Sequence, residues 1–296
     1  PGIRRGFPIS AIASSYANAT GANASDFRAW RMLCLLKLGI VFINADPAIP
    51  GGNTLEFATA SINPPCDARG PMDFNIPAEL TELRDRIADF VRSEIIPRET
   101  DERWTSHGPT ESLRRELVAL ARGNGLLAPH SPREFGGMGL GHFGRAIAFE
   151  AAGYSMLGPI AMHCAAPDEG NIHLMAEVAD ERQKQRWLSG LACGDTRSCF
   201  SMTEPDGAGS DPSMLQTIAE PAPGGYRITG RKWLITGAEG ASFTIIMAKH
   251  AGGDRDGAAT MFLADMNQPA IRLRRQLDTI DSSFSGGHWE IDFEGL

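Results

Sequence analysis

Residues 198–211 have the sequence SCFSMTEPDGAGSD, and residues 231–237 have the sequence RKWLITG. The first segment closes a run of β-formers with a turn that offers small residues, two hydroxyls and free backbone N–H groups. Such a loop can hold a phosphate through backbone amides and Ser210 without a P-loop lysine. A polar hairpin turn explains the same pattern equally well. The second segment follows about 30 residues later, where a β domain would bring it alongside the first.

The two segments together favour a binding role. Trp233 supplies a flat aromatic ring and Thr236 a hydroxyl. A bound isoalloxazine needs apolar cover on one face and hydrogen bonds to its N5 and O4 atoms. Trp233 taken by itself is more typical of a core residue.

The residues around these segments, 196–296, form short β-rich runs separated by Gly, Pro and Asp. This pattern is typical of an antiparallel sandwich or barrel. Gly230 and Arg231 mark the clearest expected hairpin turn. The expected strands cover residues 198–202, 216–219, 226–229, 232–235, 243–248, 260–264, 271–274 and 289–293.

Residues 72–195 have apolar positions at helical spacing and are predicted to form an all-α helical bundle. Leu80, Leu83 and Ile87 share one face of the first expected helix, which Pro97 is expected to end. Thr110 is the expected N-cap of a second helix. Further helices are expected over residues 142–156, 168–178 and 180–191.

Residues 1–71 show neither a helical nor a strand period. The sequence opens with Pro1, whereas Met72 begins a segment typical of an ordered domain. We expect Met72 to be the natural start and residues 1–71 to be an unstructured or non-native appendage. A genuine but poorly ordered extension is the alternative.

Length, net charge and composition exclude several classes of protein. A length of 296 residues allows about two domains. A net charge of −8 argues against nucleic-acid binding. The most apolar stretch, residues 32–43, is too short to span a membrane. The five cysteines and seven histidines lack metal-ligand spacing, so no metal site is predicted. A reducing cytoplasm is the expected location.

Gly139, Gly141 and Gly144 form a G-x-G-x-x-G pattern, which in a dinucleotide-binding unit follows a strand. Here a proline-broken loop precedes it. We therefore expect a glycine-rich loop that leads into a helix.

The chain resembles the acyl-CoA dehydrogenase family over residues 72–296. The matching motifs occur in the family's order: EFGGMGLG at 134–141, the TEP-to-GSD loop at 203–211, YRITGRKWLITG at 226–237 and GGHWEIDFEG at 286–295. The loop is one residue longer than in the commonest members. Together with APDEGN at 166–171, this length resembles the subfamily whose animal members carry a fused kinase-like domain.

The resemblance implies a helical N-terminal domain, a middle β domain and a C-terminal four-helix domain, with FAD between the last two. This sequence does not contain the third domain. By position, the resemblance implies that FAD is bound by Phe200, Ser201, Met202, Thr203, Gly209, Ser210, Trp233, Ile235 and Thr236.

The resemblance also implies individual roles. Ser210 would contact the pyrophosphate or the acyl-CoA substrate, Trp233 would cover the flavin face away from the substrate, and Thr236 would hydrogen-bond near N5. Leu234 occupies a variable position between them. Turn geometry is the expected role of Glu204 and Asp211.

Family chemistry is α,β-dehydrogenation of acyl-CoA thioesters in fatty-acid β-oxidation, with an electron-transferring flavoprotein as the usual acceptor. The family's catalytic base lies in the C-terminal domain, so no catalytic residue is named. We expect an inactive fragment that binds FAD weakly, and a homodimer or homotetramer for the full-length protein. Two alternatives remain: an acyl-CoA oxidase-like flavoprotein, and a non-catalytic binding or assembly module.

Overall fold

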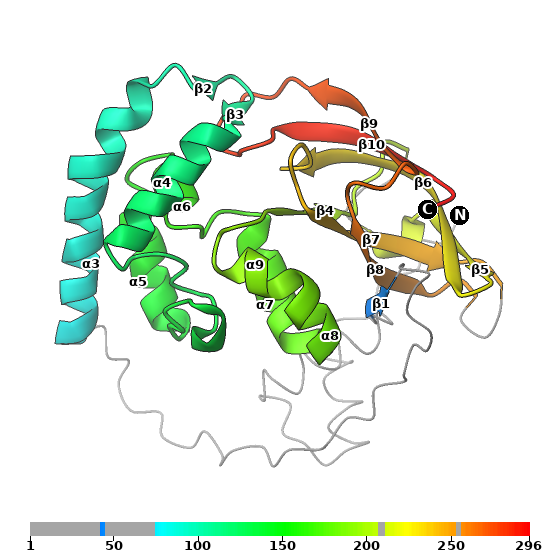
Figure 1. Ribbon diagram of the computed structural model, residues 1–296, viewed down its shortest axis with the longest axis horizontal. Coiled ribbons are helices and arrows are strands. Elements are labelled where there is room, and N and C mark those ends of the chain that lie inside the picture. Colours follow the sequence, from blue (N-terminus) through cyan, green and yellow to red (C-terminus); the bar gives the residue numbers. More distant parts are fainter. Residues whose placement is uncertain (1–41, 45–74, 207–210, 253–255) are drawn as a thin grey trace, which may run out of the picture.

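The computed structural model describes residues 42–44, 75–206, 211–252 and 256–296 (Figure 1). Most helices come first along the chain and most strands of the large sheet follow, as the sequence predicts. The helical segments are α3 (Ala78–Phe90), η1 (Val91–Ile95), η2 (Ile96–Thr100), α4 (Glu111–Gly123), η3 (Arg133–Phe135), α5 (His142–Ala152), α6 (Gly158–Ala161), α7 (Asp168–Val178), α8 (Glu181–Gln183), η4 (Lys184–Leu188), α9 (Ser189–Ala192) and η5 (Pro212–Met214).

The first helix forms because its apolar residues recur on one side. Leu83, Ile87 and Phe90 are buried in α3, at the spacing that places side chains on one helical face. The expected end at Pro97 is wrong, because the α-helix ends at Phe90 and a π-helical turn and a 3-10 turn continue to Thr100. Pro97 is tolerated there because the first turn of a new helical segment needs no N–H from it.

The second helix begins where the sequence predicts. The Thr110 hydroxyl accepts a hydrogen bond from the backbone N–H of Leu113 at 3.4 Å, which confirms Thr110 as the N-cap of α4. The helices α3, α4, α5 and α6 enclose one apolar core of their own. None of the helices in the described part of the chain is long and apolar enough to cross a membrane.

The later helices pack on the sheet instead of joining this bundle. Ile172 of α7 and Leu191 of α9 share an apolar cluster with Phe243, Ile245 and Leu263 of the sheet. Figure 1 shows α7, α8 and α9 beside β4, β7 and β8. The predicted domain boundary at residue 195 therefore separates helices from strands along the chain, while packing joins α7–α9 to the strands.

The β part is one large mixed sheet and one two-stranded ribbon. The sheet order is β1-β8-β7-β5-β6-β10-β9, with β4 also paired to β7. Most pairs are antiparallel, while β4 and β5 run parallel to β7, and β1 runs parallel to β8. The strands are β1 (Phe42–Asn44), β2 (Trp104–Thr105), β3 (Gly108–Pro109), β4 (Ser198–Ser201), β5 (Ile218–Ala222), β6 (Gly225–Thr236), β7 (Phe243–His250), β8 (Ala259–Asp265), β9 (Ile271–Leu277) and β10 (His288–Glu294).

The sheet has two faces with different surroundings. Its inner face encloses an apolar core that includes Cys199, Ile228, Ile235 and Ile291. Its outer face is the opposite one, which α7–α9 cover over β4, β7 and β8. The strand β1 lies in a region where the sequence predicts no strand, and the assignment of residues 1–71 as an appendage stays a prediction.

The predicted hairpin at Gly230 and Arg231 is wrong, because β6 runs without a break from Gly225 to Thr236. Gly230 is required by a close approach: a Cβ atom there would lie 2.5 Å from Oγ1 of Thr217. The actual turn joins β5 to β6, with Gly224 at φ 85°.

The glycine pattern before α5 forms the expected loop. Gly139 has φ 61°, and α5 begins three residues later at His142. No strand occurs between residues 126 and 141, all of which the structure describes. The structure confirms a glycine-rich loop that leads into a helix.

Candidate functional site

The centre of the candidate site is a β-bulge in β6. Lys232 pairs with Ile291 and Ile235 pairs with Trp289, so two residues of β6 oppose the single residue between them on β10. The two bulge residues are Trp233 and Leu234. Leu234 has φ 56°, a left-handed conformation that is uncommon for a residue with a branched side chain.

The bulge explains the spacing of the predicted site residues. In a regular strand Trp233 and Thr236, three positions apart, would point to opposite faces. The extra residue restores a common face, because Ile235 turns inward into the inner core while Trp233 and Thr236 stay half-buried on the outer face. The Arg275 guanidinium lies 5.8 Å from the Trp233 ring centroid.

The end of β4 lies beside this bulge. The backbone N–H of Trp233 donates to the carbonyl oxygen of Thr203 at 2.8 Å. Phe200 and Met202 are half-buried and pack against the apolar cluster of the outer face. Sequence segments about 30 residues apart therefore meet side by side, as the sequence predicts.

Two predicted site residues point away from this face. Ser201 is fully buried and its hydroxyl lies 2.8 Å from that of Thr244. Ile235 belongs to the inner core. Only the backbone of these two residues can face a ligand on the outer side. Gly209 and Ser210 lie outside the described residues.

A buried ion pair fixes the loop that follows β4. Lys232 is fully buried, and its Nζ atom donates to the Met202 carbonyl oxygen and to Glu204 Oε1, both at 2.9 Å. Glu204 also accepts from the backbone N–H groups of Gln216 and Thr217, at 2.6 and 2.9 Å. The carboxylate of Glu204 thus ties three segments together.

The electrostatics of this pair follow from its burial. Burial lowers the pKa of Lys232 to about 8, although Glu204 opposes that shift. Burial alone would raise the pKa of Glu204, but hydrogen bonds from Thr217 and Lys232 bring it below its ordinary value. Asp211 accepts from the backbone N–H and the hydroxyl of Ser213, at 2.9 and 2.8 Å. The expected turn-forming role is confirmed for Asp211, whereas Glu204 joins three separate segments instead of shaping a local turn.

Two features of the outer face were not predicted from the sequence. Leu234 is 44% exposed at the bulge and presents an apolar side chain to solvent. His288 pairs with Thr236 across β10 and β6, and its Nδ1 atom lies 3.0 Å from the Thr236 hydroxyl. A bulge at Leu234 is indicated only if Trp233 and Thr236, three positions apart in one strand, are required to share a face, and no local signal indicates His288.

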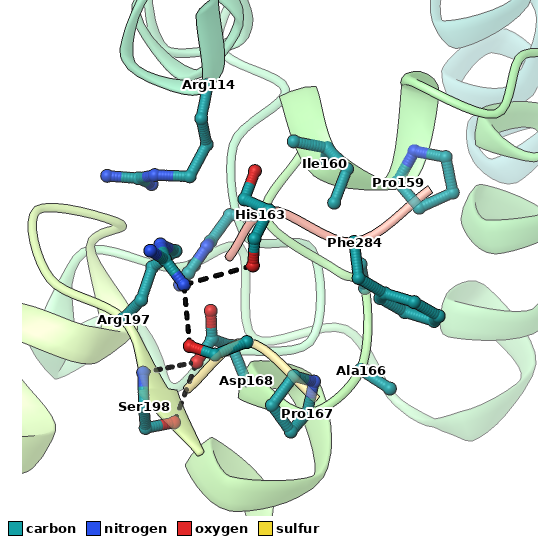
Figure 2. A pocket seen from close by; sticks show the side chains of 13 residues that line it. Arg114, Pro159, Ile160, His163, Ala166, Pro167, Asp168, Arg197, Ser198 and Phe284 are labelled. Carbon is teal, nitrogen blue, oxygen red and sulfur yellow. Dashed lines mark hydrogen bonds between the residues drawn. The ribbon is translucent and has the colours of Figure 1, made fainter. Parts of the chain in front are cut away.

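A small cavity of about 20 Å³ lies between the helical part and the sheet. Figure 2 shows Arg114, Arg197 and Asp168 on one side of it, with Ile160 and Phe284 on the other. That volume suffices for a water molecule and not for a substrate. Across the described ranges, no three His, Cys, Asp or Glu side chains gather to hold a metal ion.

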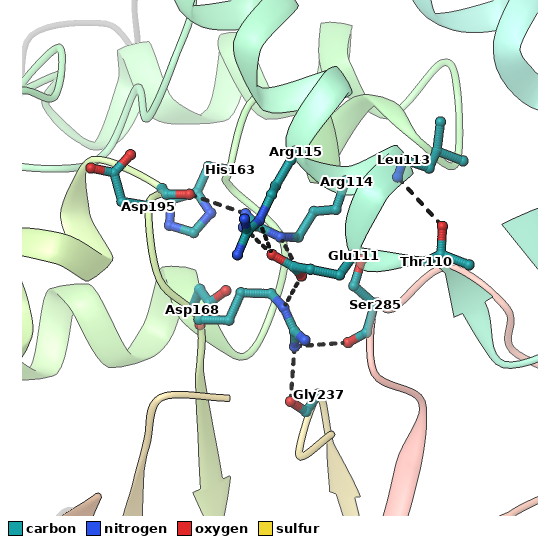
Figure 3. A network of polar contacts seen from close by, with 12 residues as sticks. Thr110, Glu111, Leu113, Arg114, Arg115, His163, Asp168, Asp195, Gly237 and Ser285 are labelled. Atoms are coloured by element: carbon teal, nitrogen blue, oxygen red, sulfur yellow. Dashed lines mark hydrogen bonds and ion pairs between the residues drawn. The ribbon is translucent and has the colours of Figure 1, made fainter. Parts of the chain in front are cut away.

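Arg197 connects the helical part to the sheet beside this cavity. It donates to Glu111 Oε2 at 3.1 Å and to the carbonyl oxygens of Gly237 and Ser285 at 2.9 and 3.2 Å. Glu111 also accepts from Arg114 and Arg115 (Figure 3). Burial alone would raise the pKa of Glu111, but the bonds from Arg114 and Arg115 lower it to about 2.

The start of β4 is fixed from the helical side. Asp168 accepts from the backbone N–H and the hydroxyl of Ser198, at 2.8 and 2.7 Å. The side-chain amide of Asn171 donates to the same hydroxyl at 2.9 Å. The APDEGN segment, singled out in the sequence, thus positions the strand that leads to Phe200.

The chain combines a helical bundle with a curled sheet, and the sheet carries a bulge beside the TEP loop. This two-part architecture also occurs in known protein families. The acyl-CoA dehydrogenase N-terminal domain matches residues 77–195, and the acyl-CoA dehydrogenase middle domain matches residues 199–294. The chain therefore belongs to the acyl-CoA dehydrogenase family.

Individual relatives agree with this assignment. "Acyl-CoA dehydrogenase family member 11" from Gallus gallus is 30% identical over 71% of this chain and 29% of its own length. It confirms the resemblance to that animal subfamily. "Probable acyl-CoA dehydrogenase FadE2" from Mycobacterium tuberculosis is 31% identical over 76% of this chain and 57% of its own length.

Solved structures show the same fold. A structure assigned as an acyl-CoA dehydrogenase from Mycobacterium abscessus has a TM-score of 0.66 and 30% identity, over 75% of this chain and 59% of that chain. A glutaryl-CoA dehydrogenase from Mycobacterium smegmatis in complex with FADH2 has a TM-score of 0.58 and 20% identity, over 75% and 54%. The chain spans less than two thirds of the length of these four proteins.

Proposed function

We propose that this chain takes part in FAD-dependent α,β-dehydrogenation of acyl-CoA thioesters, as in fatty-acid catabolism, and that its outer face at the β6 bulge holds the flavin. The observation that carries the proposal is the common face of Trp233 and Thr236 beside the end of β4. Family membership supports the reaction class, and the FADH2 complex of the glutaryl-CoA dehydrogenase supports the cofactor.

The residues present fit a flavin ring. Phe200, Met202 and Trp233 are half-buried and offer apolar surface that excludes water. Thr236 brings a hydroxyl to the same face, and Thr203 lies two residues after the end of β4. The Lys232–Glu204 pair fixes the loop from below, so the surface is built before a ligand arrives.

FAD, when bound, would accept the hydride removed from the β-carbon of the substrate. The chain's own share is to hold and orient the ring: apolar cover comes from Trp233 and Leu234, and hydrogen bonding comes from Thr236. Gly209 and Ser210 stay proposed contacts for the pyrophosphate or the acyl-CoA. We assign no residue of this chain as the catalytic base.

The remaining parts of the proposal concern partners and place. An electron-transferring flavoprotein is the proposed acceptor, with a homodimer or homotetramer as the proposed assembly and the cytoplasm as the proposed location. Two measurements on the FAD-loaded full-length protein supplied with an acyl-CoA discriminate the alternatives. Oxygen consumption by that protein would favour an oxidase, and no turnover of it with either acceptor would favour a binding module.

FAD titration of the purified chain tests the proposed site directly. We expect quenching of flavin fluorescence on binding, and affinity losses of about tenfold for Trp233→Ala and for Thr236→Val, as expected for one lost hydrogen bond or stacking contact. Tyr154→Ala, at an exposed residue of the helical part, is the control and should bind like wild type. Equal affinity in all four proteins would contradict the assignment of the site.

A further inference from the structure

Thr236 and His288 form a side-chain pair on the outer face. They oppose each other in the antiparallel register of β6 and β10, and directly opposite residues of such a pair share a face. The Thr236 hydroxyl lies 3.0 Å from His288 Nδ1, which is hydrogen-bond distance. The imidazole therefore contacts the hydroxyl that we assign to the flavin.

The backbone on both sides of this pair is held in place. Gly237, the next residue after Thr236, donates to the carbonyl oxygen of Gly287 at 2.7 Å. The buried Arg197 guanidinium bonds the Gly237 and Ser285 carbonyl oxygens. The contact between Thr236 and His288 is thus a built feature of the strand ends.

The surroundings of His288 favour a neutral ring. The ring is half-buried, with the Phe284 ring edge-on at a centroid distance of 5.7 Å. Burial lowers the pKa of His288, and the carboxylate of Asp281 opposes this shift. Thr236 and Leu277 flank it on β6 and β9. A neutral imidazole has one donor and one acceptor nitrogen, and the tautomer decides which of them is Nδ1.

We propose that His288 is a positioning residue of the flavin site, which sets through its Nδ1 atom whether the Thr236 hydroxyl donates to the ring or accepts from it. This inference rests on the proposed function. When Nδ1–H donates to Thr236 Oγ1, the hydroxyl proton is free for a ring nitrogen that accepts. When Nδ1 accepts the hydroxyl proton, Oγ1 presents lone pairs to a ring nitrogen that carries hydrogen.

The two arrangements differ only in proton positions. Moving the proton between Nδ1 and Nε2 of His288 reverses the direction of the hydrogen bond without moving a heavy atom. Because a protonated imidazole donates from both nitrogens, acid fixes Thr236 as a donor. The Thr236–His288 pair can therefore follow either oxidation state of a bound flavin at neutral pH and only one of them in acid.

A double-mutant cycle on the full chain tests the proposal. We expect Thr236→Val and His288→Phe each to weaken FAD binding about tenfold, and the double variant to bind about as weakly as either single one. His288→Asn places an amide that can donate or accept near the Nδ1 position and should restore most of the affinity. His142→Asn, at an exposed residue, is the control.

Two further measurements separate positioning from a merely structural role. Nitrogen chemical shifts of His288 in the flavin-free chain should change in Thr236→Val and not in the control. In FAD-loaded protein, the midpoint potential should lose an inflection with pH in both His288→Phe and His288→Asn, because neither side chain takes up a proton.

The outcomes distinguish the two levels of inference. Affinity losses that simply multiply in the double variant, or His288 shifts that ignore Thr236→Val, would overturn the role of His288 while FAD binding stands. Wild-type chain that binds no FAD would refute the proposed function and the role of His288 toward flavin with it.

Discussion

Trp233 and Thr203 are joined by one backbone hydrogen bond of 2.8 Å, which links the bulge of β6 to the start of the loop that follows β4. Directly beneath it, Lys232 donates to Met202 and Glu204. Lys232, the residue before the bulge, and Glu204, the residue after Thr203, therefore form a second link between the two segments. Two links across the same gap fix the relative position of the two segments that we propose face the flavin.

The first prediction concerns this buried pair. Glu204→Gln should lower the free energy of unfolding by about 3 kcal/mol, because it leaves the Lys232 ammonium buried without its carboxylate. The double variant with Lys232→Met should lose less than the sum of the single losses. Urea unfolding of Glu204→Gln, Lys232→Met and the double variant measures the three losses of free energy. Asp89→Asn, which breaks an exposed pair with Arg92, should change little, and a similar loss there would contradict the role of burial.

The sequence predicts those parts of the molecule that local patterns determine. Leu83, Ile87 and Phe90 announce α3 because their spacing alone defines the buried face. Gly230 leads to a wrong prediction because a glycine between two β-rich runs is typical of a turn. The structure requires a glycine there because Thr217 on the neighbouring chain segment lies too close for a Cβ atom. Such a contact depends on strand pairing, which a single sequence does not display.

The same distinction holds in the site. Trp233 and Thr236 are predicted by residue type and order, and the structure places them on one face. The role of Arg197 depends on partners 40 and 88 positions away, and that of His288 depends on a partner 52 positions away. No local sequence pattern therefore predicts either role. The family resemblance implies a flavin contact for Ile235, but the bulge turns its side chain inward.

A second prediction tests the account of Gly230. Gly230→Ala should lower the free energy of unfolding by about 1–3 kcal/mol, because the new methyl group would overlap Thr217. Gly225→Ala is the matched control in the same strand, since no atom lies within 4 Å of a Cβ there. Thermal or urea unfolding of both variants provides the measurement. Equal losses would show that strand propensity, and not the close approach, is responsible.

A third prediction concerns acid stability at the contact between the helical part and the sheet. The pKa of Glu111 in the folded protein, about 2, lies below the ordinary 4.5, so its stabilising effect is complete above about pH 4.5 and is lost as the pH falls toward 2. Glu111→Gln should therefore flatten the fall of unfolding free energy with acid. Glu181→Gln, also at the first position of a helix, is the control. An unchanged pH slope in Glu111→Gln would contradict the prediction.

His130 provides the fourth prediction, because it is a buried base without a hydrogen-bonding partner among the described residues. Both ring nitrogens lack a partner, the side chain is 3% exposed, and burial lowers its pKa from 6.5 to about 3. Below about pH 6.5 the unfolded chain takes up a proton that the folded chain refuses, so stability falls as the pH falls, by up to about 1.4 kcal/mol per pH unit. His130→Leu should match or exceed the wild-type free energy of unfolding at pH 8. Between pH 7 and about pH 4 it should lose less of this free energy than wild type does. Part of the pH dependence should remain, because burial also lowers the pKa of His163. Urea unfolding at each pH measures the slopes.

The exposed His142→Leu is the control and should leave the wild-type slope unchanged. A His130→Leu slope equal to that of His142→Leu would show that His130 takes up its proton in the folded protein.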